Sequence, residues 1–366
     1  MLSPLFRETA FEDLPGWDKD RHDRAFEAFR RSAIHAASKP YRSGSLGIAS
    51  ASFGGAYAEA LTCGDLGEAE AREFFERQFV PCRLAPDRST EGFVTGFYEP
   101  IVHASAVRTA SFRFPLLARP PELVAVDDAT RPPGLDAYLA YARATPAGYV
   151  EIFDRQQIEQ GALDGRGLEI AFVSDPVDAF FIHVQGAARL AMMDGTFRRI
   201  TYAAKSGQRF TGPGGVLADV GEIPREQVTM QSIRAWFRAH PERVAEILWQ
   251  NRSYIFFREA EVDDPDLGPI AAAKVPLTPG RSIAVDRALH TFGTPFYIDA
   301  PSLTAFGDGP FRRLMIAQDT GSAIVGPARG DLFAGSGDAA GEIAGVVRNA
   351  ADFYILVPSS LVGSPS

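Results

Sequence analysis

The chain has 366 residues, 46% of them hydrophobic, so we expect two domains or one domain with a large insertion. Its formal net charge of −9 argues against nucleic acid as the main partner, because binding to phosphates requires a basic surface. A mostly uncharged carbohydrate polymer stays compatible with this charge, and no apolar stretch approaches the roughly 20 residues of a membrane helix.

The first ninety residues are expected to be helical. Apolar residues recur at helical spacing over 19–37 and again over 66–79, where Phe74, Phe75 and Phe79 mark the buried stripe. From about residue 91 the pattern changes to β, with a strand over 93–98 that ends at Glu99-Pro100.

The N-terminus and the cysteines bear on the compartment. The first ten residues lack the basic and apolar regions of an export signal. Cys63 and Cys82 can pair in an oxidising compartment or remain two buried thiols, and the sequence leaves both readings open.

The middle of the chain is expected to form an antiparallel β domain. The proline-rich segment 113–135 is interpreted as a connecting loop, and short apolar runs at 168–173, 179–184 and 197–202 favour strands. Pro224 and Pro241 each predict the start of a helix. Two successive helices also occur in DNA-binding helix-turn-helix motifs, but the acidic charge and the β-rich region that follows disfavour that interpretation.

The last hundred residues predict a compact barrel or sandwich. Short strands are expected at 281–286, 295–299, 312–318 and 352–357, separated by glycine-rich turns.

Two aspartates in this last region are the main candidates for chemistry. Asp319 follows the apolar run 314–317, and Asp331 lies further along a segment with glycines at 321, 326, 330, 335 and 337. A carboxylate at a strand end, followed by glycines, can lie at the edge of a cleft with few side chains around it. The ordinary alternative is that both aspartates only form Asx-type turns.

Other chemistries lack their motifs. The six histidines show no ligand spacing for a metal, so neither a metal nor a cofactor is expected. The chain has no Gly-x-Ser-x-Gly elbow, no Gly-x-Gly-x-x-Gly and no phosphate loop. Carboxylate acid–base chemistry remains, and cleavage of a glycosidic bond requires it.

Several residues are of the types that contact sugars. The aromatic faces of Tyr98 and Tyr202, the amide of Gln185 at an expected strand end, the cation of Lys205 on an expected turn and the hydroxyl of Thr95 together predict a polar groove. Each also has an ordinary interpretation, such as a buried tyrosine, a strand-end amide or a solvated lysine.

Motifs in order from about 91 to 357 carry a resemblance. They include Thr95-Gly-Phe-Tyr-Glu-Pro100, Phe181-Ile-His-Val-Gln-Gly186, Tyr202-Ala-Ala-Lys-Ser-Gly207, Asp319-Thr-Gly-Ser-Ala-Ile324 and Gly330-Asp-Leu-Phe333. In this combination the chain resembles the MltA family of peptidoglycan-cleaving lytic transglycosylases.

The resemblance implies a mainly β fold with some α. A discontinuous double-psi β-barrel domain would comprise 1–100 and 259–366, with a 3D-type motif in its C-terminal part. A β-rich domain over 101–258 would be inserted into it, and the substrate groove would run between the two domains.

The resemblance also implies the reaction. Such an enzyme cleaves the MurNAc–GlcNAc β-1,4 bond of peptidoglycan glycan strands without water and leaves 1,6-anhydroMurNAc ends. The family's catalytic acid falls on Asp331 and its partner aspartate on Asp319. Thr95, Tyr98, Gln185, Tyr202 and Lys205 are the expected substrate contacts, and proteins of cell-wall synthesis or turnover are possible partners.

Two departures from the family pattern and two alternatives accompany this interpretation. Phe97 stands where the family has tyrosine, which removes a hydroxyl, and the family's export signal is not recognised here. The resemblance places the working enzyme in the periplasm, associated with the outer membrane. The alternatives are a non-catalytic, expansin-like glycan-binding protein and a glycosidase that hydrolyses the bond with Asp319 and Asp331.

Overall fold

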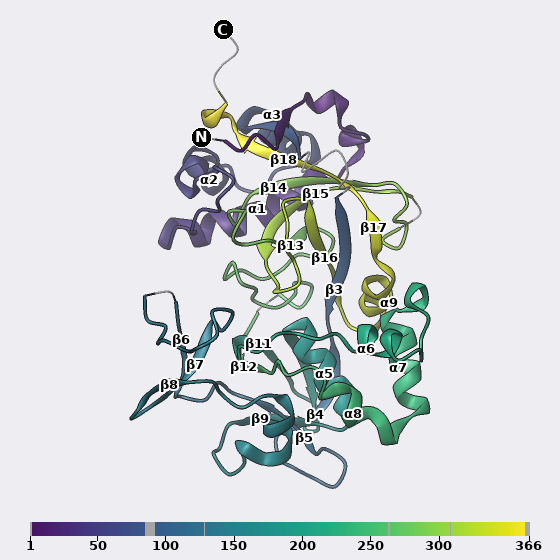
Figure 1. The fold of residues 1–366 in the computed structure, drawn as a ribbon. Coiled ribbons are helices and arrows are strands. Elements are labelled where there is room, and N and C mark those ends of the chain that lie inside the picture. Colours follow the sequence, from purple (N-terminus) through teal and green to yellow (C-terminus); the bar gives the residue numbers. More distant parts are fainter. Residues whose placement is uncertain (1, 85–91, 128, 263, 308, 363–366) are drawn as a thin grey trace. The chain divides into compact units, whose positions relative to one another are not determined.

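The computed structural model describes residues 2–84, 92–127, 129–262, 264–307 and 309–362. The chain divides into two compact units: Met1–Tyr98 with Val262–Ser366, and Glu99–Glu261 (Figure 1). Both units are mainly β with helices, as the sequence predicted.

The first unit is built on a nine-stranded sheet. In spatial order its strands are β1 (Phe6–Glu8), β2 (Phe79–Leu84), β18 (Asp352–Pro358), β14 (Pro295–Ala300), β15 (Phe311–Asp319), β13 (Ser282–Val285), β16 (Arg329–Ser336), β3 (Phe93–Glu99) and β17 (Arg348–Ala350). β13 pairs in parallel with β15 and antiparallel with β16. The expected strands are therefore present, but their order among the described residues is open from β1 to β17, so these pairings do not close the predicted barrel.

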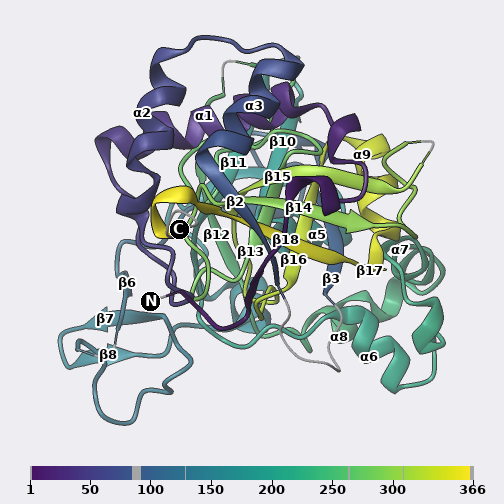
Figure 2. The ribbon, with the colours of Figure 1, turned by 90° about the horizontal axis from the view of Figure 1, so that it is seen from above.

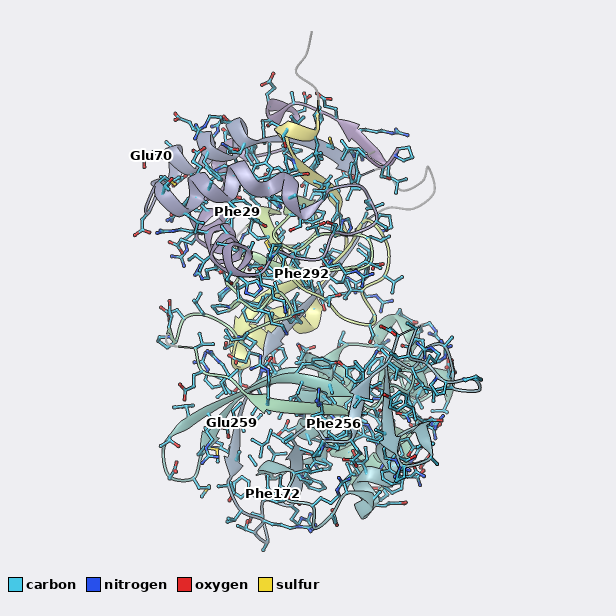
Figure 3. All side chains as sticks on the ribbon, turned by 90° about the vertical axis from the view of Figure 1, so that its left-hand side faces the viewer. Phe29, Glu70, Phe172, Phe256, Glu259 and Phe292 are labelled. Carbon is cyan, nitrogen blue, oxygen red and sulfur yellow. The ribbon has the colours of Figure 1, made fainter. Side chains whose placement is uncertain are left out.

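Helices α1 (His22–Ser38), α2 (Gly54–Thr62) and α3 (Glu68–Gln78) lie together on one side of this sheet (Figures 1 and 2). Figure 3 labels Phe29 of α1. Its ring lies 5.7 Å from that of Phe74 and 5.8 Å from those of Phe75 and Phe79. Burial of each such ring contributes about 1.5–3 kcal/mol. The amphipathic patterns over 19–37 and 66–79 are thus confirmed as the helices that cover the main core.

Two elements beside the candidate aspartates were not expected, because glycine disfavours both helices and strands. β16 occupies part of the glycine-rich segment, and α9 (Asp338–Val346) follows it. The glycines are needed for close approach: a Cβ on Gly330 would lie 2.5 Å from Cδ1 of Ile283, and one on Gly341 would lie 2.9 Å from Cε2 of Tyr98.

The second unit contains two sheets. The six-stranded sheet has the order β12 (Ile255–Glu259), β11 (Phe197–Lys205), β10 (Ala187–Met192), β4 (Ile101–Ser105), β9 (Glu169–Val173) and β5 (Phe114–Leu117). The three-stranded sheet comprises β6 (Leu123–Ala125), β7 (Tyr141–Thr145) and β8 (Gly148–Val150). Figure 3 labels Phe256, which β12 contributes to the buried core of this unit.

The interpretation of 113–135 as a loop is wrong, because this segment contains β5 and β6. Pro115 lies on β5, which is the last strand in the order of its sheet, and proline is tolerated on such edge strands because they make fewer ladder hydrogen bonds.

The strand expected at 179–184 is also wrong, because these residues belong to helix α5 (Pro176–Gln185). The side chain of Asp175 caps the helix by accepting the N–H of Val177 at 2.8 Å, and Gly186 ends it with a φ of 74°. A short apolar run has the same pattern in a buried helix and in a strand. Gln185 therefore ends a helix and not a strand.

The remaining helices of this unit are α4 (Arg155–Gln157), α6 (Pro213–Asp219), α7 (Met230–Ala239) and α8 (Val244–Leu248). The helix expected from Pro224 begins only at Met230, where Thr229 and Ser232 form a capping box. The prediction from Pro241 is confirmed, since a 3₁₀ turn at Pro241–Arg243 leads directly into α8. Among the described residues no helix combines the length and the apolar character needed to cross a membrane.

Candidate active site

Asp319 and Asp331 lie on two strands of the first unit's sheet, and both pair with the same residue of the strand between them. Asp319 ends β15, Asp331 is the third residue of β16, and Ala284 of the intervening strand β13 pairs with both. Residues that pair directly across neighbouring strands project from the same face. Both carboxylates therefore project from one face, with Ala284 on the strand between them and a β-bulge beside it. Asp331 lies within a strand, so the alternative that both aspartates only form turns is wrong for this residue.

The same face carries a small apolar cluster. Phe97, Leu277, Ala284, Ile324 and Phe333 are buried together, and the rings of Phe97 and Phe333 lie 5.2 Å apart. Phe333 follows Asp331 by two residues, which places both on one side of β16. Phe97 is thus part of the apolar surroundings on the face that carries the aspartates.

These surroundings change the acidity of both carboxyl groups. Burial raises the pKa of Asp319 to about 6, backbone N–H groups of Thr320 and Ala272 partly oppose this, and the charge of Asp331 raises it further. Burial also raises the pKa of Asp331, against the opposing effects of the Thr95 hydroxyl and the Arg329 cation. For both carboxyl groups, burial is the largest cause of the raised pKa.

A directed chain of hydrogen bonds holds Asp331. Arg329 donates from Nη2 to Oγ1 of Thr95 at 2.7 Å, and Thr95 donates from Oγ1 to Oδ1 of Asp331 at 2.6 Å. A guanidinium can only donate, so the Thr95 hydroxyl must direct its own proton to Asp331. Oδ1 is then an acceptor in both protonation states, and a proton on Asp331 resides on Oδ2.

Arg329 was not among the residues predicted from the sequence. It precedes Asp331 by two residues, and the strand period of two places both on the same face. This signal was missed because the glycine-rich segment was not recognised as a strand.

Asp319 is held by backbone groups. Its Oδ1 accepts the N–H of Ala272 at 3.2 Å, and the next residue, Thr320, donates its hydroxyl to the carbonyl of Val285 at 2.8 Å. Lys274, whose charge lowers the pKa of Asp319, has a φ of 63°, a left-handed conformation that is uncommon for a residue other than glycine. Such strained residues are frequent at functional sites.

The predicted substrate contacts are divided between the two units. Tyr98 is 7% exposed, and its ring packs over Gly341 of α9, whereas Thr95 bonds Asp331 from the alternate position of β3. Gln185, Tyr202 and Lys205 belong to the second unit, and Lys205 ends β11 instead of lying on the expected turn. The structure thus brings Thr95 to Asp331, and glycan contacts of Tyr98, Gln185, Tyr202 and Lys205 in a shared cleft stay a prediction.

Within the described ranges, no three His, Cys, Asp or Glu side chains are grouped so that they could hold a metal ion. Cys63 and Cys82 are both free thiols, the first partly buried and the second buried.

Two family models match the chain: the MltA specific insert domain over residues 93–258 and the 3D domain over residues 281–357. The crystal structure of the membrane-bound lytic murein transglycosylase from Agrobacterium tumefaciens is 51% identical, with a TM-score of 0.92 over 97% of this chain and 98% of that one. The chain belongs to the MltA family.

The family likeness extends to more distant members. Membrane-bound lytic murein transglycosylase A of Escherichia coli K12 is 31% identical over 268 residues, which are 72% of this chain. The match spans 64% of the length of that MltA protein. A crystal structure of E. coli MltA with bound chitohexaose is 25% identical, with a TM-score of 0.69 over 98% of this chain and 95% of that one.

Proposed function

We propose that this MltA-family protein is a lytic transglycosylase that cleaves the MurNAc–GlcNAc β-1,4 bond of peptidoglycan, with Asp331 as its acid and base. The observation that carries the proposal is the state of Asp331. Its pKa is raised by burial, its Oδ1 is occupied by Thr95, and Oδ2 remains to exchange a proton.

The reaction follows from one carboxyl group. Oδ2 of Asp331 protonates the glycosidic oxygen, and the bond from C1 of the muramic acid to that oxygen breaks. The resulting carboxylate then accepts the proton of the C6 hydroxyl on the same sugar, and the C6 oxygen bonds to C1. Because this nucleophile is tethered to the reacting ring, its effective concentration is high and no water is consumed.

Asp319 has a supporting role in this proposal. Its pKa of about 6 leaves it partly protonated near neutral pH, which limits the negative charge beside Asp331. Two carboxylates on one face are also what a hydrolase requires. The pair therefore keeps hydrolysis as a second candidate, and the product separates the two reactions.

Glycan binding is proposed to involve both units. An MltA relative was crystallised with chitohexaose, which shows that a family member binds a sugar chain of this length. In the second unit Tyr202 is 39% exposed, and Lys205 and Gln185 are partly accessible. We assign these three residues to the glycan. Tyr98, whose ring packs over Gly341 of α9, stays a predicted contact of the glycan.

Mass spectrometry of products from purified sacculi tests the function. We expect anhydro-muropeptides from the wild type and none from Asp331→Asn, which keeps the shape of the side chain but removes its acid. Asp338→Asn, an exposed aspartate at the start of α9, is the matched control and should cleave normally.

Three results would contradict the proposal. Reducing-end muropeptides would show hydrolysis, and the absence of soluble product would favour an expansin-like binding protein. Near wild-type turnover by Asp331→Asn would remove the assignment of the acid.

The site of action is proposed to be the periplasm, in association with the outer membrane, because peptidoglycan lies there. Cell fractionation tests this, and recovery of the native protein in the cytoplasm alone would contradict it.

A further inference from the structure

The second unit presents two cations over one partly exposed tyrosine, Tyr138. Cζ of Arg209 lies 4.2 Å from the ring centroid of Tyr138, and Nζ of Lys205 lies 5.5 Å from it. Both contacts have the geometry of cation–π interactions, which use the ring face and leave the N–H groups of the cations available.

The segment that carries both cations is held firmly. Ser206 donates its N–H to the carbonyl of Tyr254 at 2.8 Å, and Gln208 donates from Nε2 to the carbonyl of Ile152 at 2.8 Å. Gly207 has a φ of 98°, and a Cβ there would lie 2.8 Å from Cδ2 of Leu139. Lys205 and Arg209 therefore flank a buried turn that fits closely against the Tyr138 segment.

The Tyr138 segment is held as well. Arg131 donates from Nη1 to the carbonyls of Asp136 and Leu139 at 2.8 and 2.6 Å, and the N–H of Tyr138 bonds Oδ1 of Asp136 at 2.8 Å. The two backbone segments that carry the cations and the ring are thus positioned before any ligand arrives, which lowers the entropy lost on binding.

The charges of these cations are not neutralised within the part of the chain that the structure describes. Neither Lys205 nor Arg209 forms an ion pair there, and burial lowers the pKa of Lys205 with no carboxylate to oppose it. The carboxylates close by are engaged: Asp136 caps its turn, and Glu151 accepts from Gln208 and Arg252. Two neighbouring cations that form no ion pair of their own favour an anionic ligand.

Tyr202, one of the predicted sugar contacts, lies beside these cations. A β-bulge between Tyr202 and Ala204 adds one residue to β11, so that Tyr202 and Lys205 face the same side despite their odd spacing. The Tyr202 hydroxyl lies 3.4 Å from that of Tyr141, next to the segment that carries Tyr138. An anion bound here would lie beside a ring suited to a sugar.

We propose that Tyr138, Lys205 and Arg209 form a subsite for a carboxylate of the peptidoglycan strand. Peptidoglycan carries such groups on its stem peptides, or on the lactyl group of muramic acid where the stem has been removed. The proposal rests on the proposed function, because it assumes a peptidoglycan substrate. It predicts that the protein distinguishes peptidoglycan from a neutral polymer such as chito-oligosaccharide.

Binding to three ligands tests the subsite. The ligands are glycan fragments with stem peptides, the same fragments stripped of their stems by an amidase, and chitohexaose. Affinity is measured by calorimetry in the Asp331→Asn background, so that the result does not depend on whether or how the bond is cleaved. Arg209→Gln is compared with Arg238→Gln, which removes an exposed arginine of α7.

We expect Arg209→Gln to weaken binding of stem-bearing fragments about tenfold, the loss of one charge-assisted hydrogen bond, and to leave chitohexaose binding unchanged. A loss confined to stem-bearing fragments identifies the stem peptide as the source of the carboxylate, and a loss on stripped fragments identifies the lactyl group. Equal losses on all three ligands, no loss on any of them, or no binding of peptidoglycan fragments would overturn the proposal. If the wild type forms no anhydro-sugar but Arg209→Gln still weakens binding of peptidoglycan fragments selectively, only the proposed reaction is overturned.

Discussion

At the scale of single residues, the chemistry of the site depends on the direction of the hydrogen bonds around Asp331. Arg329 forces the Thr95 hydroxyl toward Oδ1, so the reactive proton is confined to Oδ2. The same hydroxyl lowers the pKa of Asp331 against the effect of burial. Thr95 thus sets both the position and the acidity of the proposed acid.

Thr95→Val should therefore lower kcat about tenfold, because the carboxyl group loses one orienting hydrogen bond. Since that bond lowers the pKa of Asp331, its removal should move the alkaline limb of the kcat profile to higher pH. Thr95→Ser keeps the hydroxyl and should restore both values. Turnover measured across pH checks this, and an unmoved alkaline limb in Thr95→Val would contradict it.

The buried charge of Asp319 has a cost in stability. Its pKa in the folded protein is about 6, above the ordinary value of 3.8, so its stabilising contribution is full below about pH 4 and is lost as the pH rises through 6. Asp319→Asn should be more stable than the wild type at pH 8, by about 1–2 kcal/mol after the weakened backbone hydrogen bonds are allowed for, while its turnover falls.

Chemical unfolding at pH 8 and at pH 4 checks this prediction. The stability difference between the two proteins should disappear at the lower pH. A variant that is less stable than the wild type at both values would show that the carboxylate is structurally required.

At the scale of elements, the residues of the site lie on neighbouring strands, and helix α9 packs against one of these strands at a glycine. Thr95 on β3, Asp331 on β16, Ala284 on β13 and Asp319 on β15 lie side by side. On the other side of β3, Tyr98 packs over α9 where Gly341 leaves room for its ring. The position of β3, and hence of Thr95, depends on this contact.

Gly341→Ala should destabilise the protein by about 1–3 kcal/mol, because the added Cβ would lie 2.9 Å from the Tyr98 ring. Alanine normally stabilises a helix relative to glycine by about 0.5–1 kcal/mol. Gly55→Ala on α2, where the nearest atom to the new Cβ is 3.9 Å away, is the matched control and should be stabilising. Thermal melts of both variants test this prediction. Equal changes in Tm would contradict the close packing of Gly341 against Tyr98.

At the scale of the whole molecule, the proposed reaction occurs in the first unit while three predicted glycan contacts lie in the second. Both units belong to one chain joined at the Tyr98–Glu99 and Glu261–Val262 boundaries. If both contact the same glycan, residues of the second unit contribute to binding and not to the chemical step.

Tyr202→Ala should accordingly raise KM for glycan strands several-fold, about the loss of one aromatic contact, with kcat nearly unchanged. Tyr149→Ala, which removes a tyrosine of similar exposure on β8, serves as the control. Steady-state kinetics on soluble strands provide the measurement. An unchanged KM would contradict the predicted contact between the second unit and the substrate.

Local patterns in the sequence determined helices α1 and α3 of the first unit, several strands and the candidates Asp319 and Asp331, because amphipathic periodicity and strand ends are readable over a few residues. They did not determine α5 or β16: a short apolar run fits both helix and strand, and glycines required by close approach look like loop glycines. Only tertiary structure placed Thr95 beside Asp331, 236 residues away, identified Arg329 and paired Lys205 with Arg209 over Tyr138. Such contacts depend on strand pairing and on segment packing between residues distant in the chain, and no local pattern records which distant residues will meet.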